Sequence, residues 1–203
     1  MESPCSTARH HFDYLSTHTK VEVRQAERVE IPAIAAMARS MVPGVQIEEQ
    51  GLLRHYLHDE ESILVFARQG RLLGGMAFLY LSERGHDALM SGELSPTHPA
   101  FSLLADREAE VAAIYIWAIG AVGRGIAGLG KAAAQLRQQR YVNADCFARP
   151  STAAGRDLMI ATGFRPIASS RADLWCYERP WKRLPAGIGM SNFSRGSIFD
   201  ARY

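Results

Sequence analysis

Residues 118–131 read AIGAVGRGIAGLGK, the end of an apolar strand that runs into a glycine-rich turn and then into a helix. Glycines let the backbone approach a ligand closely and adopt positive φ angles. The N–H groups in the first turn of a helix lack intrahelical partners and lie at the positive end of its dipole. The pattern therefore predicts an anion site suited to phosphates. A tight connection that binds nothing remains the alternative.

Two known phosphate-binding motifs do not fit this turn. A dinucleotide-binding fingerprint lies in the first βαβ unit of its domain, with an acidic residue about 20 positions further on. Here the turn lies past the middle of the chain and after a hairpin, although Asp145 would supply the acidic residue. A P-loop ends in Gly-Lys followed by Ser or Thr. Ala132 follows Gly130-Lys131 here and supplies no hydroxyl for magnesium.

Hydrophobic periodicity predicts alternating strands and helices around the turn. Expected strands cover residues 21–24, 62–68, 72–81, 110–121, 143–148, 166–169 and 174–178, and expected helices cover 27–41, 47–58, 129–140 and 152–162. The connection over 82–109 is long enough to carry function or a short helix of its own. The strand over 110–121 is the most apolar and is expected at the centre of the sheet. These elements predict an α/β fold with a mixed, mostly antiparallel central sheet flanked by helices.

Length and composition restrict the class of protein. The chain has 203 residues, of which 47% are hydrophobic and 22% charged, as in a globular domain. Its net charge of +2 is too small to suggest a nucleic-acid partner. No apolar run is long enough to span a membrane as a helix. Three cysteines without a CxxC pair favour a reduced, cytoplasmic setting without a disulfide framework or a structural zinc.

The chain is expected to divide into three parts. A flexible arm is predicted over residues 1–19, a single domain over 20–181 and a basic tail over 182–203. The tail is either solvated or docks a partner. His55 and His58 lie three residues apart on an expected helix, and two such ligands are too few to predict a metal site.

The order of these elements resembles that of the GCN5-related N-acetyltransferases (GNAT family) over residues 20–178. The strand over 114–120, the loop over 125–130 and the segment over 152–164 carry the resemblance. The family's loop motif is Q/R-x-x-G-x-G/A. Gly128 and Gly130 match its two small positions, whereas Gly125 stands at the Q/R position and Arg124 lies one residue early. The resemblance implies a GNAT-like acyl-CoA N-acyltransferase fold, acetyl-CoA as co-substrate and, by analogy, a homodimer.

The resemblance also implies how the co-substrate is held. The pantetheine arm would lie between the fourth and fifth strands, against the backbone of Ala118, Ile119 and Gly120. The pyrophosphate would lie on Gly125, Ile126, Ala127, Gly128, Leu129 and Gly130. Arg124, Lys131 and Arg165 would screen the phosphates or lie in solvent. Thr152 stands where many members have an asparagine that contacts the arm, and it also suits a helix N-cap.

Proton transfer is less well defined by the resemblance. Many members have a tyrosine general acid four residues before the terminal glycine, and some have a carboxylate on the fifth strand. Met159 stands at the position of the tyrosine and cannot donate a proton. Phe147 stands at the position of the carboxylate and cannot accept one. Glu110 is the first candidate for the base, acting through a water, and Glu108 is the second. Tyr115 would donate to the leaving thiolate or position the acceptor. Each of these residues also suits a purely structural role, and Cys146 is expected to be a buried, inert thiol.

The acceptor is expected to be an amine. Residues 27–60 carry six acids against three bases, and residues 84–110 carry five against two, so each segment has a net charge of −3. This distribution suits a cationic acceptor, or it is ordinary charge scatter.

The predicted function is therefore transfer of an acetyl (acyl) group from a coenzyme A thioester to a primary amine by direct attack. The amine belongs to a small molecule (polyamine-like, aminoglycoside-like or an amino acid) or to a protein lysine or N-terminus. The alternative is a catalytically inactive acyl-CoA-binding or protein-interaction module on the same fold.

Overall fold

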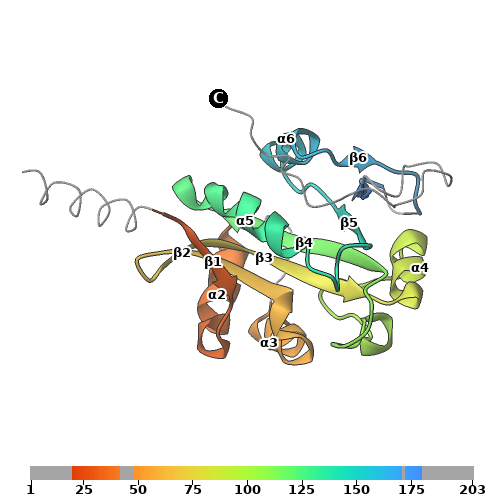
Figure 1. Cartoon of the computed structure of the whole chain (residues 1–203), viewed down its shortest axis with the longest axis horizontal. Coiled ribbons are helices and arrows are strands. Elements are labelled where there is room, and N and C mark those ends of the chain that lie inside the picture. The colour runs from red at the N-terminus through yellow and green to blue at the C-terminus, as the bar shows by residue number, and fades with distance from the viewer. Residues whose placement is uncertain (1–19, 42–47, 171, 180–203) are drawn as a thin grey trace, which may run out of the picture.

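A computed structural model describes residues 20–41, 48–170 and 172–179. Within them, seven strands form one sheet in the order β1-β2-β3-β4-β5-β7-β6 (Figure 1). The strands are β1 (Glu22–Gln25), β2 (Ile63–Arg68), β3 (Arg71–Leu81), β4 (Ala113–Ala121), β5 (Asp145–Ala148), β6 (Arg165–Pro166) and β7 (Trp175–Tyr177). β4 and β5 are parallel, and the other neighbouring strands are antiparallel. The predicted fold class and the central place of β4 are confirmed.

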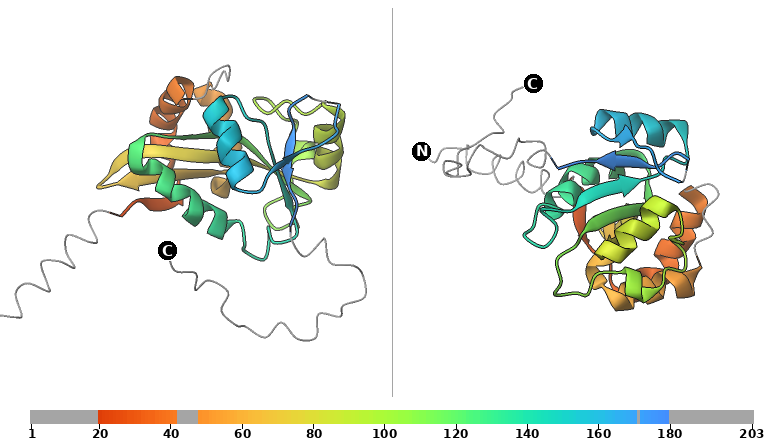
Figure 2. Two further views of the ribbon diagram at one scale, coloured as in Figure 1. Left: turned by 90° about the horizontal axis from the view of Figure 1, so that it is seen from above. Right: turned by 90° about the vertical axis from the view of Figure 1, so that its right-hand side faces the viewer.

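Helices cover both faces of the sheet. The α-helices are α2 (Ile31–Met41), α3 (Glu49–His58), α4 (Glu83–Ser91), α5 (Gly128–Gln135) and α6 (Ala153–Ala161). Short 3₁₀ helices are η1 (Arg28–Glu30), η2 (Glu60–Ser62), η3 (Phe101–Leu103) and η4 (Gly123–Ala127). α2 and α3 lie on one face of the sheet and α5 on the opposite face (Figures 1 and 2).

Two hydrophobic cores follow from this arrangement, one on each face of the sheet. The first joins α2, α3 and α4 to the sheet and contains Ile34, Leu52 and Trp117. The second lies under α5 and contains Phe66 and Ala132. Alternate residues of a strand project to opposite faces, and the central strands therefore contribute to both cores.

Several boundaries differ from the sequence-based expectation. The connection over 82–109 contains α4, and Ser82 caps this helix by accepting a hydrogen bond from the Gly85 N–H. The regular part of β4 begins at Ala113, so Glu110 lies outside it. Helical backbone begins at Gly123 instead of near residue 129 and runs through η4 into α5, because the Gly128 N–H donates back to the carbonyls of Gly125 and Ile126.

The predicted arm over residues 1–19 and tail over 182–203 lie outside the described residues. In the part of the chain that is described, no helix has the length and apolar character needed to cross a membrane.

Candidate active site

β4 has a partner on both sides over only part of its length. Its residues Ala113 to Ile116 pair with β5, whereas its pairing with β3 continues to Ala121. β5 ends at Ala148 and is followed by Pro150, which cannot donate to a ladder. Among the described residues, the edge of β4 from Trp117 to Ala121 therefore has no strand beside it. Backbone N–H and C=O groups at such an edge can pair with an extended ligand that carries amides.

A β-bulge lies where this open edge begins. Ala118 pairs with Ala77 and Ile116 pairs with Phe78, so Trp117 is an extra residue with no counterpart on β3. A bulge bends a strand and increases its twist. The bend occurs at the residue where the pairing with β5 ends, so the two parallel strands diverge from there.

A cleft of about 670 Å³ occupies this divergence. Five of the predicted site residues line it, namely Tyr115, Ala118, Ile119, Leu129 and Thr152. Most of the remaining wall is apolar and comes from β4, β5, α6 and the connections next to them, with Met41 of α2, Met76 of β3, Ala133 of α5 and Tyr177 of β7. Clefts that are largely apolar, with a few convergent polar groups, are typical ligand sites.

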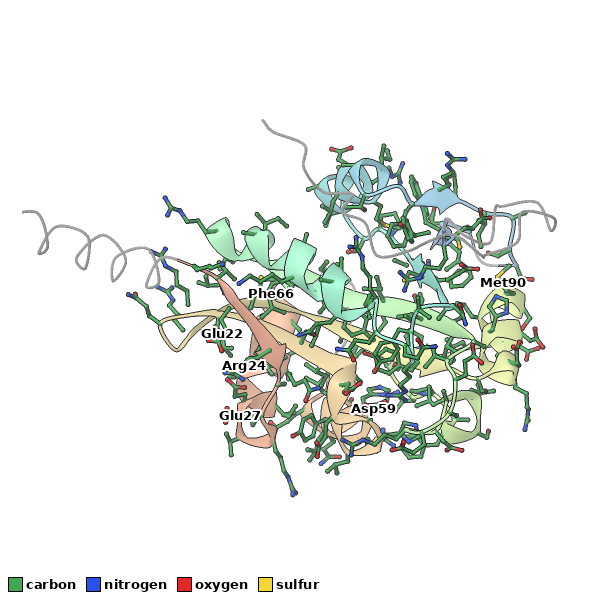
Figure 3. The ribbon with its side chains drawn as sticks, viewed as in Figure 1. Glu22, Arg24, Glu27, Asp59, Phe66 and Met90 are labelled. Carbon is green, nitrogen blue, oxygen red and sulfur yellow. The ribbon has the colours of Figure 1, made fainter. Side chains whose placement is uncertain are left out.

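The glycines of the turn have different surroundings. A Cβ on Gly128 would lie 2.7 Å from the ring of Phe66, which lies between the sheet and α5 (Figure 3). A Cβ on Gly125 would lie 2.8 Å from the Leu73 carbonyl oxygen. Gly128 and Gly125 are therefore needed for packing. Gly130 and Gly123 have open space around them, and Gly123 has a φ of +52°.

The N-terminal end of the helical segment lies at Gly123 and Arg124. The N–H groups of Gly125 and Gly128 are already used, since they donate to the carbonyls of Val122 and of Gly125 and Ile126. By helix geometry the first N–H groups, on Gly123 and Arg124, lack an intrahelical acceptor. The first N–H groups of the helical segment therefore precede residues 125–130, over which the sequence predicts an anion site.

The predicted role of Lys131 does not fit the structure. Its Nζ donates to the carbonyl oxygen of Val21 at 2.5 Å, next to β1. Lys131 does not line the cleft. Lys131 lies two residues from Leu129, which lines the cleft, and side chains two residues apart point to roughly opposite sides of a helix.

Two exposed arginines that sequence reasoning did not select, Arg137 and Arg149, line the cleft. Leu129, Ala133 and Arg137 recur every four residues and form one face of α5 and its continuation. This spacing is the signal in the sequence from which Arg137 could have been selected. Arg149 directly follows β5. Its position beside the cleft depends on the path of the chain after this strand, which the sequence pattern does not predict.

Glu110 lies away from the cleft. It is exposed, its Oε1 accepts a hydrogen bond from Asn143 Nδ2 at 3.1 Å, and it lines a separate groove of about 720 Å³ with Glu83 and Phe101. Glu108, the second candidate, is also exposed and lines neither space. Neither of these carboxylates therefore lines the cleft.

Two tyrosines line the cleft instead. Tyr115 on β4 is 5% exposed, and Tyr177 on β7 is half-buried beside Phe164. The sequence reasoning did not select Tyr177. Neighbouring residues of a strand project to opposite faces, so Tyr177 lies on the other face from the buried Cys176, and this alternation was the available signal. Met159 also lines the cleft, which is the position expected from the resemblance.

Cys146 and Phe147 are both buried, and Cys146 also lines the cleft. Burial raises the pKa of the Cys146 thiol to about 11, so it stays protonated at neutral pH. The Phe147 ring packs in the core, with its centroid 5.4 Å from that of His86. Thr152 caps α6, because its Oγ1 accepts a hydrogen bond from the Gly155 N–H at 3.0 Å.

The charged side chains of the cleft wall are arginines. Arg137, Arg149 and Arg179 line it, and no Asp or Glu among the described residues does. The acidic side chains of the two segments that suggested a cationic acceptor therefore do not line this cleft, although Met41, Pro96 and Thr97 of those segments do. No group of three or more His, Cys, Asp and Glu side chains that could hold a metal ion occurs within the same described part of the chain.

Comparison with known proteins identifies the fold. No family model matches the chain, and no curated protein sequence does. The PaiA N-acetyltransferase from Thermoplasma acidophilum, in complex with coenzyme A, matches with a TM-score of 0.51 and 10% identity over 79% of this chain and 99% of that one. Ard1 from Thermoplasma volcanium matches with a TM-score of 0.50 and 12% identity over 77% and 93%.

A shorter likeness is found to the loading GNATL domain of CurA from Lyngbya majuscula. It has a TM-score of 0.49 and 11% identity, and it covers 64% of each chain. The first two matches, together with the sheet order, show that this chain has the fold of the GCN5-related N-acetyltransferases. The predicted GNAT-like fold is thereby confirmed.

Proposed function

We propose that this protein is an acyl-CoA-dependent N-acyltransferase that transfers an acyl group from a coenzyme A thioester to a primary amine. One observation carries the proposal. The open edge of β4 from Trp117 to Ala121 leads directly into the helical segment that begins at Gly123. An amide-bearing arm that ends in a pyrophosphate matches this sequence of groups, because the arm would pair with the edge and the anion would meet the helix N-terminus.

The dimensions of the edge support a position for the thioester. Four residues of strand at about 3.3 Å each separate Ala121 from Trp117 by about 13 Å. With the pyrophosphate at Gly123 and Arg124, an extended arm that pairs along this edge would bring the thioester to the bulge at Trp117. The cleft widens into its remaining volume there, and the acceptor amine would enter beside Tyr115 and Thr97.

The chain's own groups would then act as follows. A neutral amine attacks the thioester carbonyl carbon, the C–S bond breaks, and the thiolate leaves. The hydroxyl of Tyr115 or Tyr177 donates a proton to that thiolate, since both line the cleft and Met159 has no proton to give. The proton of the attacking amine passes to water. Arg137 and Arg149 stabilise the phosphates of the co-substrate.

A catalytically inactive acyl-CoA-binding module is the second candidate function, and Met159 favours it. This module would bind coenzyme A thioesters but release no thiol with any amine. Thiol release measured with a panel of small amines and peptide N-termini separates the two candidates. Loss of release in Tyr115→Phe or Tyr177→Phe, with binding retained, identifies the donor.

The binding step is tested at Gly123. Asn and Asp both tolerate a positive φ, so Gly123→Asn and Gly123→Asp carry the same backbone cost and differ by one charge. A carboxylate at a helix N-terminus stabilises the helix but repels a bound phosphate. We expect acetyl-CoA to bind Gly123→Asp at least about 10-fold more weakly than Gly123→Asn by calorimetric titration, with no loss of thermal stability.

Equal affinities for the two variants would place the phosphates elsewhere. No binding of acetyl-CoA or coenzyme A to the unaltered protein at about 1 mM, a threshold of about −4 kcal/mol, would reject both candidate functions.

A further inference from the structure

A small side cavity of about 30 Å³ lies beneath α2, next to the main cleft. The two spaces share five wall residues, which are Met41, Met76, Trp117, Ala118 and Ile119. They therefore adjoin one another, and side chains alone separate them. All the other residues that line the side cavity are apolar as well, and they come from α2, α3, β2, β3 and β4.

The side cavity is bordered by two glycines that pair with one another. Gly75 of β3 pairs with Gly120 of β4, and both line the cavity. Paired residues of neighbouring strands project to the same face of the sheet. A Cβ on Gly75 would lie 2.6 Å from the Leu64 carbonyl oxygen, so the backbone of β2 already fills the space beside it. A Cβ on Gly120 would lie 3.1–3.6 Å from atoms of the Met41 side chain, so Met41 covers the space beside Gly120.

We propose that this side cavity receives the acyl chain of the thioester and makes the protein selective for acyl groups of about four carbons over acetyl. The inference rests on the proposed function, which places the thioester at Trp117. Trp117 belongs to the walls of both spaces, so an acyl chain that extends from there enters the side cavity. Its wall side chains are apolar apart from the indole N–H of Trp117, so a hydrocarbon displaces few polar contacts there.

The volume sets the chain length. A cavity needs about 10–15 Å³ by this measure to hold one water-sized group, so about two carbons fit beyond the acetyl methyl. Met41 and Met76 stand between the cleft and the cavity. Methionine is unbranched and changes rotamer easily, so these side chains can move aside for the acyl chain.

The first experiment compares ligands by calorimetric titration of the full-length protein. The probes are free coenzyme A and its acetyl, propionyl, butyryl and hexanoyl thioesters. Burial of each added methylene strengthens binding about fourfold. We therefore expect affinity to rise by this factor per carbon from acetyl to butyryl and to fall for hexanoyl.

A pair of alanine variants on α2 tests the location. Ala38 lines the side cavity, whereas Ala36 is exposed on the same helix. Ala38→Leu fills the cavity, so it should remove the preference for butyryl-CoA while acetyl-CoA binds as before. Ala36→Leu makes the same change in solvent and should leave the profile unaltered. Met37→Ala enlarges the cavity and should move the optimum toward hexanoyl, which keeps the test available if Ala38→Leu folds poorly.

The outcomes distinguish this inference from the function on which it rests. If no thioester binds and free coenzyme A does not bind, the proposed function fails. If acetyl-CoA binds but affinity declines with each added carbon, the inference fails and the proposed function stands. The inference also fails if Ala38→Leu and Ala36→Leu give the same profile.

Discussion

His55 is a titratable side chain that the structure places in an apolar core. It lies on α3, is 4% exposed, and its ring centroid is 5.5 Å from that of Trp117. Burial lowers the pKa of His55 to about 4, and the positive charges of Arg54 and neighbouring histidines add to this effect. The nearby Thr97 backbone acts in the opposite direction and is outweighed. His55 is therefore neutral at pH 7 and behaves as a core residue.

This pKa predicts how stability depends on pH. His55 titrates at about 4 in the folded protein and near 6.5 when unfolded, so the unfolded chain takes up its proton first. The contribution of neutral His55 to the free energy of unfolding is complete above pH 6.5 and declines as the pH falls toward 4. The total loss is about 3 kcal/mol, and it levels off below pH 4. Urea unfolding at several pH values measures it.

Substitution of two histidines tests the assignment. His55→Leu should lack this decline between pH 6.5 and 4, whereas His58→Gln should retain it, because His58 is only partly buried on the same helix. A decline of the same size in His55→Leu would show that other groups cause it.

At the scale of the element, the two motif glycines of α5 should respond oppositely to alanine. Gly128→Ala forces a Cβ against the buried ring of Phe66. Overpacking of this kind costs about 1–3 kcal/mol of stability. Gly130→Ala meets open space and gains helix propensity of about 1 kcal/mol. Thermal unfolding of the two variants measures the difference. Destabilisation by both would mean that the surroundings of Gly130 are not open.

The same elements show which boundaries the sequence could predict. Period-two and helical patterns located β2, β3, β4, α2 and α6 because these signals come from burial on one face. The start of helical backbone at Gly123 was missed, since glycines there suggested a loop and the deciding hydrogen bonds join backbone groups within the turn. The bulge at Trp117 was also missed, because an extra residue leaves no mark in the pattern of side chains.

At the scale of the whole molecule, the order of elements was enough to predict the mixed sheet and the GNAT-like fold. It also brought Tyr115, Ala118 and Thr152 to one cleft. The roles of Glu110 and Lys131 could not be judged in this way. Each depends on which way a side chain leaves an element, and packing against distant parts of the chain sets that direction. The Val21 carbonyl holds Lys131, and Asn143 holds Glu110.

Arg179 joins the last described strand to the connection between α5 and β5. It is 5% exposed, and its guanidinium donates to the carbonyl oxygens of Ala144 and Leu136 at 2.8 Å and of Tyr141 at 3.2 Å. Its backbone N–H donates to Asp145 Oδ1 at 2.9 Å. One side chain thus fixes three carbonyls that lie far away in the sequence, and it also forms part of the cleft wall.

Removal of this guanidinium should therefore destabilise the whole domain. Arg179→Met keeps an unbranched stem but leaves three carbonyls without these donors, and we expect a loss of about 3 kcal/mol or more in urea unfolding. Arg179→Lys should recover only part of this loss, because an ammonium lacks the planar fork that reaches all three acceptors. Arg149→Met, at an exposed arginine of the same cleft, should change stability by less than about 0.5 kcal/mol. Equal effects at residues 179 and 149 would contradict a structural role for the buried guanidinium.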